Sequence, residues 1–170
     1  MSRRGWLEVE FAGQRSGGNH TDRRDNLPYL LKLALSENWR VLLSGDTQVR
    51  LTPDVGTRLA GIGDTTATSK YRLPWDVERT AFGAEASVKL PTSKTGLGSG
   101  ARDPSLKGIY SVDLDRDFHL NADLAGTRLG KVDPGQGRTQ LAWATAVSNP
   151  LGDAWRVVVD LSGRWQRGAD

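Results

Sequence analysis

Apolar and polar residues alternate along nine segments of this chain, and one face of each segment carries no charge. In the longest segment, Trp39–Leu51, Val41 and Leu43 fall on one face and Arg40 and Asp46 on the other. Side chains of a β-strand point alternately to opposite faces, so this pattern predicts strands with one apolar and one polar face. The segment exceeds the 5–6 residues or so of an ordinary strand. It also exceeds the roughly 9–11 residues that cross a bilayer at the usual tilt.

The connections between the segments alternate between long and short. The nine segments are Leu7–Phe11, Tyr29–Leu35, Trp39–Leu51, Thr65–Leu73, Phe82–Leu90, Leu106–Leu114, Phe118–Leu124, Thr139–Val147 and Trp155–Trp165. The long connections are Arg15–Asn26, Pro53–Gly61, Thr92–Asp103 and Arg128–Gly137. Bacterial outer-membrane barrels have short periplasmic turns and longer external loops. The sequence therefore predicts an all-β fold, an antiparallel up-and-down transmembrane β-barrel of about nine strands.

Aromatic residues of the apolar faces gather near both ends of the segments. Those close to short turns are Trp39, Tyr71, Phe82, Phe118 and Trp155, and those close to the long connections are Phe11, Tyr29 and Trp165. Amphipathic rings favour the interface between bilayer and water, so two aromatic girdles are expected in a membrane barrel.

Composition narrows the possible partners. The 170 residues predict a single domain, residues 1–170, and no run approaches the 18 or so apolar residues of a membrane helix. Cysteine is absent, which excludes disulfides and thiolate metal sites. The formal charge is only +3, without a basic stripe, so nucleic acid is not an expected partner. The expected partner is outer-membrane lipid.

The ends of the chain differ from those of a complete outer-membrane protein. Residues Met1–Trp6 contain no apolar stretch that could serve as a signal peptide. Nine strands is an odd number, whereas single-chain bacterial barrels have even numbers. We therefore expect a partial barrel that lacks its signal peptide and C-terminal strands.

Short glycine-rich motifs carry a resemblance to a known family. Gly61-Ile62-Gly63-Asp64 precedes a predicted strand, and Val88-Lys89-Leu90-Pro91-Thr92 leads into Gly96-Leu97-Gly98-Ser99-Gly100. Together with Leu7–Phe11, Pro28–Leu51 and Asn149-Pro150-Leu151-Gly152, these motifs cover most of the chain. They resemble outer-membrane proteins labelled as transporters or phenol-degradation meta-pathway (MetA-like) proteins. Ser93 stands where that family usually has glycine. The resemblance implies an outer-membrane barrel of a Gram-negative bacterium that acts as a channel for small apolar or aromatic molecules.

The polar faces carry both charges in near-equal numbers and form the expected lumen. The residues predicted to face a solute path are Lys32, Arg40, Asp46, Arg50, Asp64, Lys70, Arg72, Glu85, Lys89, Asp113, His119, Asp123, Arg156, Asp160 and Arg164. Opposite charges on neighbouring strands can pair, whereas a charge-selective pore favours one sign. We therefore expect a lattice of ion pairs around a narrow or partly filled interior.

No catalytic, cofactor or metal site is predicted. Gly96-x-Gly98-x-Gly100 lacks the Lys-Ser/Thr of a phosphate-binding loop, and we expect a flexible outer loop there. His119 shares a face with Asp113, but neither a second histidine at ligand spacing nor a distinctive serine accompanies it. We expect His119 to be a solvated or ion-paired side chain.

Three functions fit this pattern. The first is an outer-membrane channel or transporter for small, apolar or aromatic solutes, and the second is a non-conducting structural barrel. The third is a soluble, lipocalin-like barrel that binds a ligand inside, with its apolar faces turned inward. An enzyme is not expected. Conductance separates the first two, and the direction faced by Trp143 and Trp155 separates both from the third.

Overall fold

The computed structural model describes residues 4–17, 23–53, 56–75 and 77–168, which are almost entirely β-strands and their connections. The strands are β1 (Leu7–Phe11), β2 (Gln14–Ser16), β3 (Arg23–Ala34), β4 (Trp39–Thr52), β5 (Leu59–Gly61), β6 (Thr65–Arg72), β7 (Thr80–Leu90), β8 (Asp103–Asp113), β9 (His119–Arg128), β10 (Thr139–Leu151) and β11 (Trp155–Gln166). One 3-10 turn, η1 (Asp115–Asp117), links β8 to β9. Each of the nine predicted segments overlaps one strand, although β3 begins at Arg23 rather than Tyr29 and β10 ends at Leu151 rather than Val147.

Hydrogen bonding joins the strands in an antiparallel, up-and-down order. The order is β1-β3-β4-β6-β7-β8-β9-β10-β11, with β2 also paired to β3 and β5 also paired to β4. The short strands β2 and β5 lie in the predicted long connections Arg15–Asn26 and Pro53–Gly61 and extend the sheet there. The order begins at β1 and ends at β11, so the described strands form an open sheet. The all-β, antiparallel prediction is confirmed.

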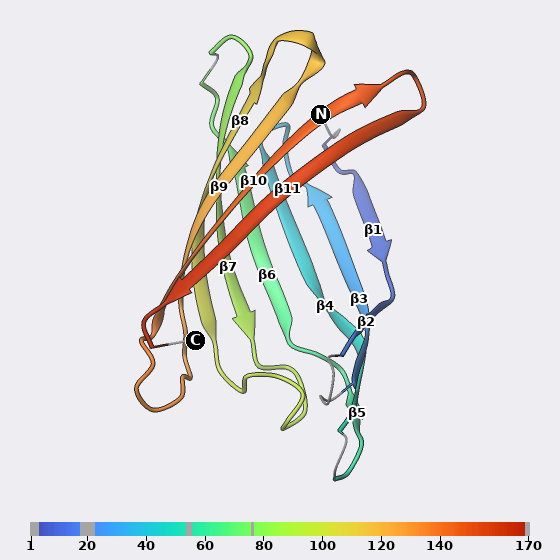
Figure 1. Ribbon diagram of the computed structural model, residues 1–170, viewed down its shortest axis with the longest axis vertical. Helices are drawn as coiled ribbons and strands as arrows, with labels where there is room; N and C mark the ends of the chain where they lie inside the picture. The colour runs from blue at the N-terminus through green and yellow to red at the C-terminus, as the bar shows by residue number, and fades with distance from the viewer. Residues whose placement is uncertain (1–3, 18–22, 54–55, 76, 169–170) are drawn as a thin grey trace. The chain divides into compact units, whose positions relative to one another are not determined.

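The sheet divides into two compact units. The first comprises Met1–Ser69 and Ser87–Asp103, and the second comprises Lys70–Ala86 and Pro104–Asp170. In the first unit β3 pairs with β1, β2 and β4. In the second unit β9 pairs with β8 and β10, and β10 forms a long hairpin with β11 (Figure 1).

The apolar faces of the strands are exposed in both units. In β4, Trp39, Val41 and Leu43 are exposed while the intervening residues are partly buried. In β11, Val159 is 63% exposed. Among the described residues only three apolar side chains are buried, namely Ala34, Val49 and Leu97. A soluble sheet with one wet face would bury the apolar face and expose the polar one, so the burial pattern here is inverted.

The predicted faces of neighbouring strands match one another in the pairs β1–β3, β9–β10 and β10–β11. Leu7, Val9 and Phe11 of β1 lie opposite apolar residues of β3. Trp143 and Val147 of β10 lie opposite apolar-face residues of both β9 and β11. Trp143 also lies across Gly163 of β11, where a Cβ would come within 2.7 Å of its indole nitrogen. Glycine at position 163 therefore makes room for an exposed tryptophan.

A β-bulge in β4 overturns the predicted faces of the residues that follow it, from Gln48 to Leu51. Pro28 pairs with Asp46 and Leu27 with Gln48, so Thr47 is the extra residue. Its hydroxyl donates a hydrogen bond to the Leu27 carbonyl at 3.0 Å. One extra residue reverses the alternation that follows.

The residues after the bulge therefore change faces. Arg50 lies opposite Asp25, on the face that carries Tyr29 and Leu31, and Val49 turns to the polar face, where it is fully buried. The prediction that Arg50 shares a face with Asp46 is wrong.

Candidate functional site

The polar faces hold the predicted lattice of ion pairs. Lys32 of β3 contacts both Glu8 and Glu10 of β1. In the second unit, Glu85 binds Lys70 at 2.9 Å and Lys107 at 3.3 Å. Lys89 pairs with Asp103, a buried carboxylate that the sequence reasoning did not select. The exposed pairs of Lys32 contribute at most about 1 kcal/mol each, so they fix side-chain positions more than they stabilise the fold.

Other predicted residues are not brought together. Within the described residues, no ion pair joins one predicted residue to another among Arg40, Asp46, Arg72, Asp123, Asp160 and Arg164. Arg156 donates a hydrogen bond to the Ser148 hydroxyl at 3.2 Å. Arg50, on the opposite face, lies outside the lattice.

One row across β8, β9 and β10 places Asp113, His119 and Ser148 opposite one another. His119 Nδ1 contacts Asp113 Oδ1. A hydrolytic triad would also require the histidine to hydrogen-bond the serine. The Ser148 hydroxyl instead accepts a hydrogen bond from Arg156. Asp113 is also largely exposed, so we interpret the row as part of the polar lattice.

Asp64 anchors the glycine-rich connection between β7 and β8. Its carboxylate accepts hydrogen bonds from the Ser93 hydroxyl at 2.6 Å, the Ser93 amide at 3.2 Å and the Ser99 amide at 3.1 Å. Thr92 adds a hydrogen bond to the Gly63 carbonyl at 3.0 Å. We call residues 91–102, held in this way, the anchored loop. The sequence predicted a flexible loop, but its hydrogen bonds attach it to the segment before β6.

Close packing accompanies these hydrogen bonds. A Cβ at Gly98 would lie 2.1 Å from the Ser93 hydroxyl and 2.4 Å from the Asp64 carboxylate, so only glycine fits there without rearrangement. Leu97 is 3% exposed and lies against Gly61. Arg24 donates a hydrogen bond to the Leu97 carbonyl at 3.3 Å. The anchored loop therefore has a small apolar contact as well as polar ones.

Opposing effects set the charge state of Asp64. Burial raises the pKa of this carboxyl, but the hydrogen bonds from Ser93 and Ser99 and the nearby Lys89 charge outweigh burial and hold the pKa below its ordinary value. Asp64 is therefore ionised at neutral pH, in the state that accepts all three hydrogen bonds.

The anchored loop borders a polar cavity of about 480 Å³. Its lining consists of Arg24, Asp46, Asp64, Lys89 and Gly96, Leu97, Gly98 and Ser99. Two cations and two carboxylates give it no net formal charge. The sequence reasoning selected Asp46, Asp64 and Lys89 but missed Arg24, Ser93 and Ser99. Position 93, where serine replaces the glycine usual in the resembled family, was the available signal.

Comparison with known proteins does not assign a function to this site, and the described residues show no metal-binding group. No family model matches the chain, and no curated protein or solved structure is significantly similar to it. Among the described residues, no helix is long and apolar enough to cross a membrane. Nor do three or more histidine, aspartate or glutamate side chains gather there in a way that could hold a metal ion.

Proposed function

We propose that the chain contributes to a β-barrel in the outer membrane of a Gram-negative bacterium and that its polar face lines a path for small solutes. The inverted burial pattern is the observation that carries this proposal. Contiguous exposed apolar surface on a protein marks contact with a membrane or with another protein. Here it repeats on strands such as β4, β10 and β11, each long enough to cross a bilayer.

The ends of the sheet agree with a membrane setting. Lipid offers no hydrogen bonds to an open strand edge, so spanning sheets close. Nearly every residue of β11 is exposed, whichever face its side chain lies on, as expected of an edge strand that lacks a second neighbouring strand. Closure of the barrel would supply that neighbour.

The balanced polar face favours small neutral solutes over ions. The cluster of Glu85 with Lys70 and Lys107 and the cluster of Lys32 with Glu8 and Glu10 together contain three cations and three carboxylates, so neither sign is in excess. The anchored loop lies over the polar side of the first unit and narrows the path. Apolar or aromatic molecules of the size of phenol are the solutes that we propose. A non-conducting barrel is the second candidate, and the paired charges and the anchored loop are what favour it.

The test is solute flux through refolded protein in liposomes. We expect uptake of phenol-sized solutes, a conductance with weak ion selectivity, and a larger conductance when a short Gly-Ser turn replaces residues 91–102. Replacing Asp133 by asparagine, in the long connection between β9 and β10, is the control and should change nothing. Absence of flux from inserted wild-type and loop-replaced protein would favour the structural barrel. Monomeric folding in plain buffer would contradict the membrane proposal itself.

A further inference from the structure

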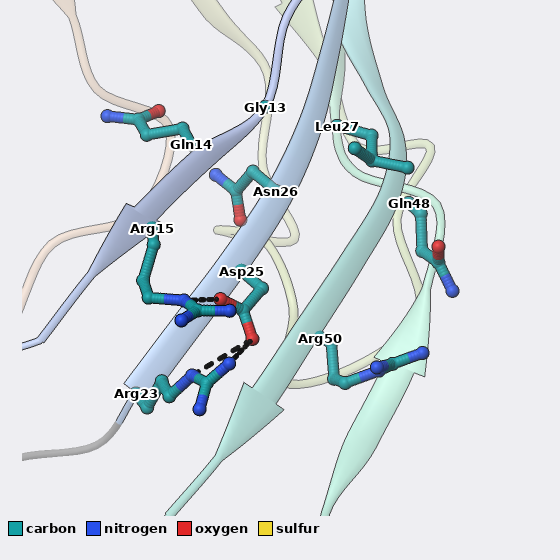
Figure 2. Close-up of a pocket in the computed structure, with 9 residues that line it drawn as sticks. All are labelled: Gly13, Gln14, Arg15, Arg23, Asp25, Asn26, Leu27, Gln48 and Arg50. Carbon is teal, nitrogen blue, oxygen red and sulfur yellow. Dashed lines mark hydrogen bonds and ion pairs between the residues drawn. The ribbon is translucent and has the colours of Figure 1, made fainter.

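Three arginines surround a cavity on the face opposite the polar lattice. Arg15 of β2 lies opposite Asp25 of β3, and Asp25 lies opposite Arg50 of β4. Arg23 lies two residues before Asp25 and therefore on the same face. In Figure 2, Arg15 and Arg23 meet at Asp25, whereas Arg50 extends from β4 away from them; all of these residues line the cavity, which has a volume of about 470 Å³.

One carboxylate organises two of the arginines. Asp25 accepts a hydrogen bond from Arg15 Nε at 2.6 Å and pairs with Arg23 Nη2 at 2.9 Å. These hydrogen bonds, first from Arg15 and then from Arg23, hold the pKa of Asp25 below its ordinary value. The carboxylate therefore stays ionised at neutral pH and keeps both guanidinium groups beside the cavity.

The cavity retains a positive excess. Arg50 has no ion pair among the described residues, and Asp25 is the only carboxylate in the lining. The side-chain amide of Gln48 adds a hydrogen-bond donor to the lining, whereas Asn26 lies on the opposite face and accepts a hydrogen bond from Arg24 at 3.1 Å. A cavity lined by guanidinium and amide donors, with one carboxylate, fits an anion with several acceptor oxygens.

The bulge at Thr47 places this cavity beside the apolar surface. Arg50 and Gln48 point to the face that carries Leu27, Tyr29 and Leu31 because the extra residue reverses the alternation. The cavity lies past Tyr29, towards the long connections. In an outer-membrane barrel this position corresponds to the headgroup level of the outer leaflet.

We propose that Arg15, Arg23 and Arg50 bind the phosphate group of a lipid headgroup. This inference rests on the proposed function, because it needs the apolar face to contact lipid. Guanidinium groups bind phosphate oxygens in pairs, and basic pockets beside a lipid-facing surface recognise phosphorylated headgroups. The exposed apolar face of the strands contacts the acyl chains, and the cavity binds the phosphate.

The test measures binding of fluorescent phosphatidic acid to the full chain refolded in uncharged detergent micelles. We expect about tenfold weaker binding for Arg50→Gln and a larger loss for the triple Arg15→Gln/Arg23→Gln/Arg50→Gln variant. Arg50→Gln keeps the Asp25 cluster intact, so it remains informative if the triple variant misfolds. Arg128→Gln, which removes another exposed arginine from an apolar face at a long connection, should bind like wild type.

Competing ligands separate the possible sources of phosphate. Inorganic phosphate should displace the lipid only at much higher concentration, and phosphatidylcholine should compete poorly because its phosphate is a diester beside a cation. Equal binding by wild type and Arg50→Gln would overturn the site. Inorganic phosphate that binds as tightly as the lipid would overturn the lipid assignment. If the wild type also folds as a monomer in plain buffer, the proposed function fails separately from the arginine site.

Discussion

The β10–β11 and β3–β4 hairpins have similar lengths but differ in regularity. In β10–β11, every residue from Gln140 to Leu151 has a partner in an unbroken register. In β3–β4, the register shifts between Leu27 and Pro28. The apolar face of β11 therefore keeps one phase along the strand, whereas the second half of β4 exchanges its faces. Alternation in sequence predicts a face only up to the next bulge.

The exchange of faces has chemical consequences. It buries Val49 on the polar side, where Leu97 of the anchored loop is also buried. It also turns Arg50 to the apolar side, beside Asp25. Both distinctive sites of the first unit, the anchored loop and the arginine cavity, thus lie at the irregular end of β3 and β4. The regular β10–β11 hairpin also borders a cavity, lined by Gln140, Arg164 and Arg167, but no exchange of faces occurs along its paired residues.

Deleting one residue from each hairpin should give the largest difference in effect between the β10–β11 and β3–β4 hairpins. Removing Thr145 from β10 reverses every later side chain, so we expect loss of membrane insertion. Removing Thr47 leaves the pairs on both sides of the bulge with their present partners, so its cost should stay near about 1 kcal/mol, that of one hydrogen bond. Heat-modifiable gel mobility after refolding into liposomes measures both. Equal tolerance of the two deletions would contradict the assigned registers.

A charge on the regular apolar face should have the next largest effect. Val159→Arg, near the middle of β11, should lower the free energy of folding into the bilayer by about 2–4 kcal/mol. Ser162→Arg, on the polar face of the same strand, is the matched control and should cost much less. Urea unfolding from liposomes gives both values. A similar cost for both variants would show that the two faces do not differ in their contact with lipid.

Filling the tight space at Gly98 should destabilise the anchored loop. Gly98→Ala places a methyl group against Ser93 and Asp64, and overpacking of this kind costs about 1–3 kcal/mol. Gly108→Ala is the control, because nothing lies within 4 Å of its added Cβ. Hydrogen exchange of the Ser93 and Ser99 amides reports on the loop directly. Unchanged exchange in Gly98→Ala would mean that the loop is not packed as described.

Neutralising Asp64 should loosen the same loop with a smaller cost. Asp64→Asn loses the charge that accepts three hydrogen bonds, and we expect a loss of about 1 kcal/mol because the carboxylate is only part-buried and water still screens its charge. A carboxyl whose pKa is lowered on folding stabilises above its unfolded pKa, and that stability is lost as pH falls through the folded pKa. Wild type at a pH well below the ordinary aspartate pKa of about 3.9 should therefore exchange its loop amides like Asp64→Asn, once both are corrected for intrinsic rates. A loop equally protected in Asp64→Asn at all pH values would exclude Asp64 as the anchor.

His119→Ala should have the smallest effect. The pair with Asp113 is exposed, so we expect less than about 0.5 kcal/mol and no change in solute flux. A p-nitrophenyl ester assay tests the alternative that Asp113, His119 and Ser148 form a hydrolytic triad. In that case wild type would hydrolyse the ester and His119→Ala would not.

The strands can be predicted from the sequence because each segment shows the two-residue alternation of apolar and polar side chains that is typical of a β-strand. All nine segments, the ion pairs of Lys32 and Glu85, and the pairing of His119 with Asp113 follow from face and neighbour alone. Thr47 carries no local sign of a bulge, so Arg50 is assigned to the wrong face. The role of Asp64 depends on Ser93 and Ser99, about thirty residues further along the chain, and such contacts have no periodic signature.

The most direct test of the account is quenching of tryptophan fluorescence by brominated lipids after refolding into liposomes. Trp39, Trp143, Trp155 and Trp165 all lie on apolar faces, and all four are exposed. We predict strong quenching that Trp143→Phe and Trp155→Phe reduce in proportion. Absence of quenching, together with a native strand signal in plain buffer, would contradict the assignment of these faces to lipid and favour a soluble ligand-binding barrel.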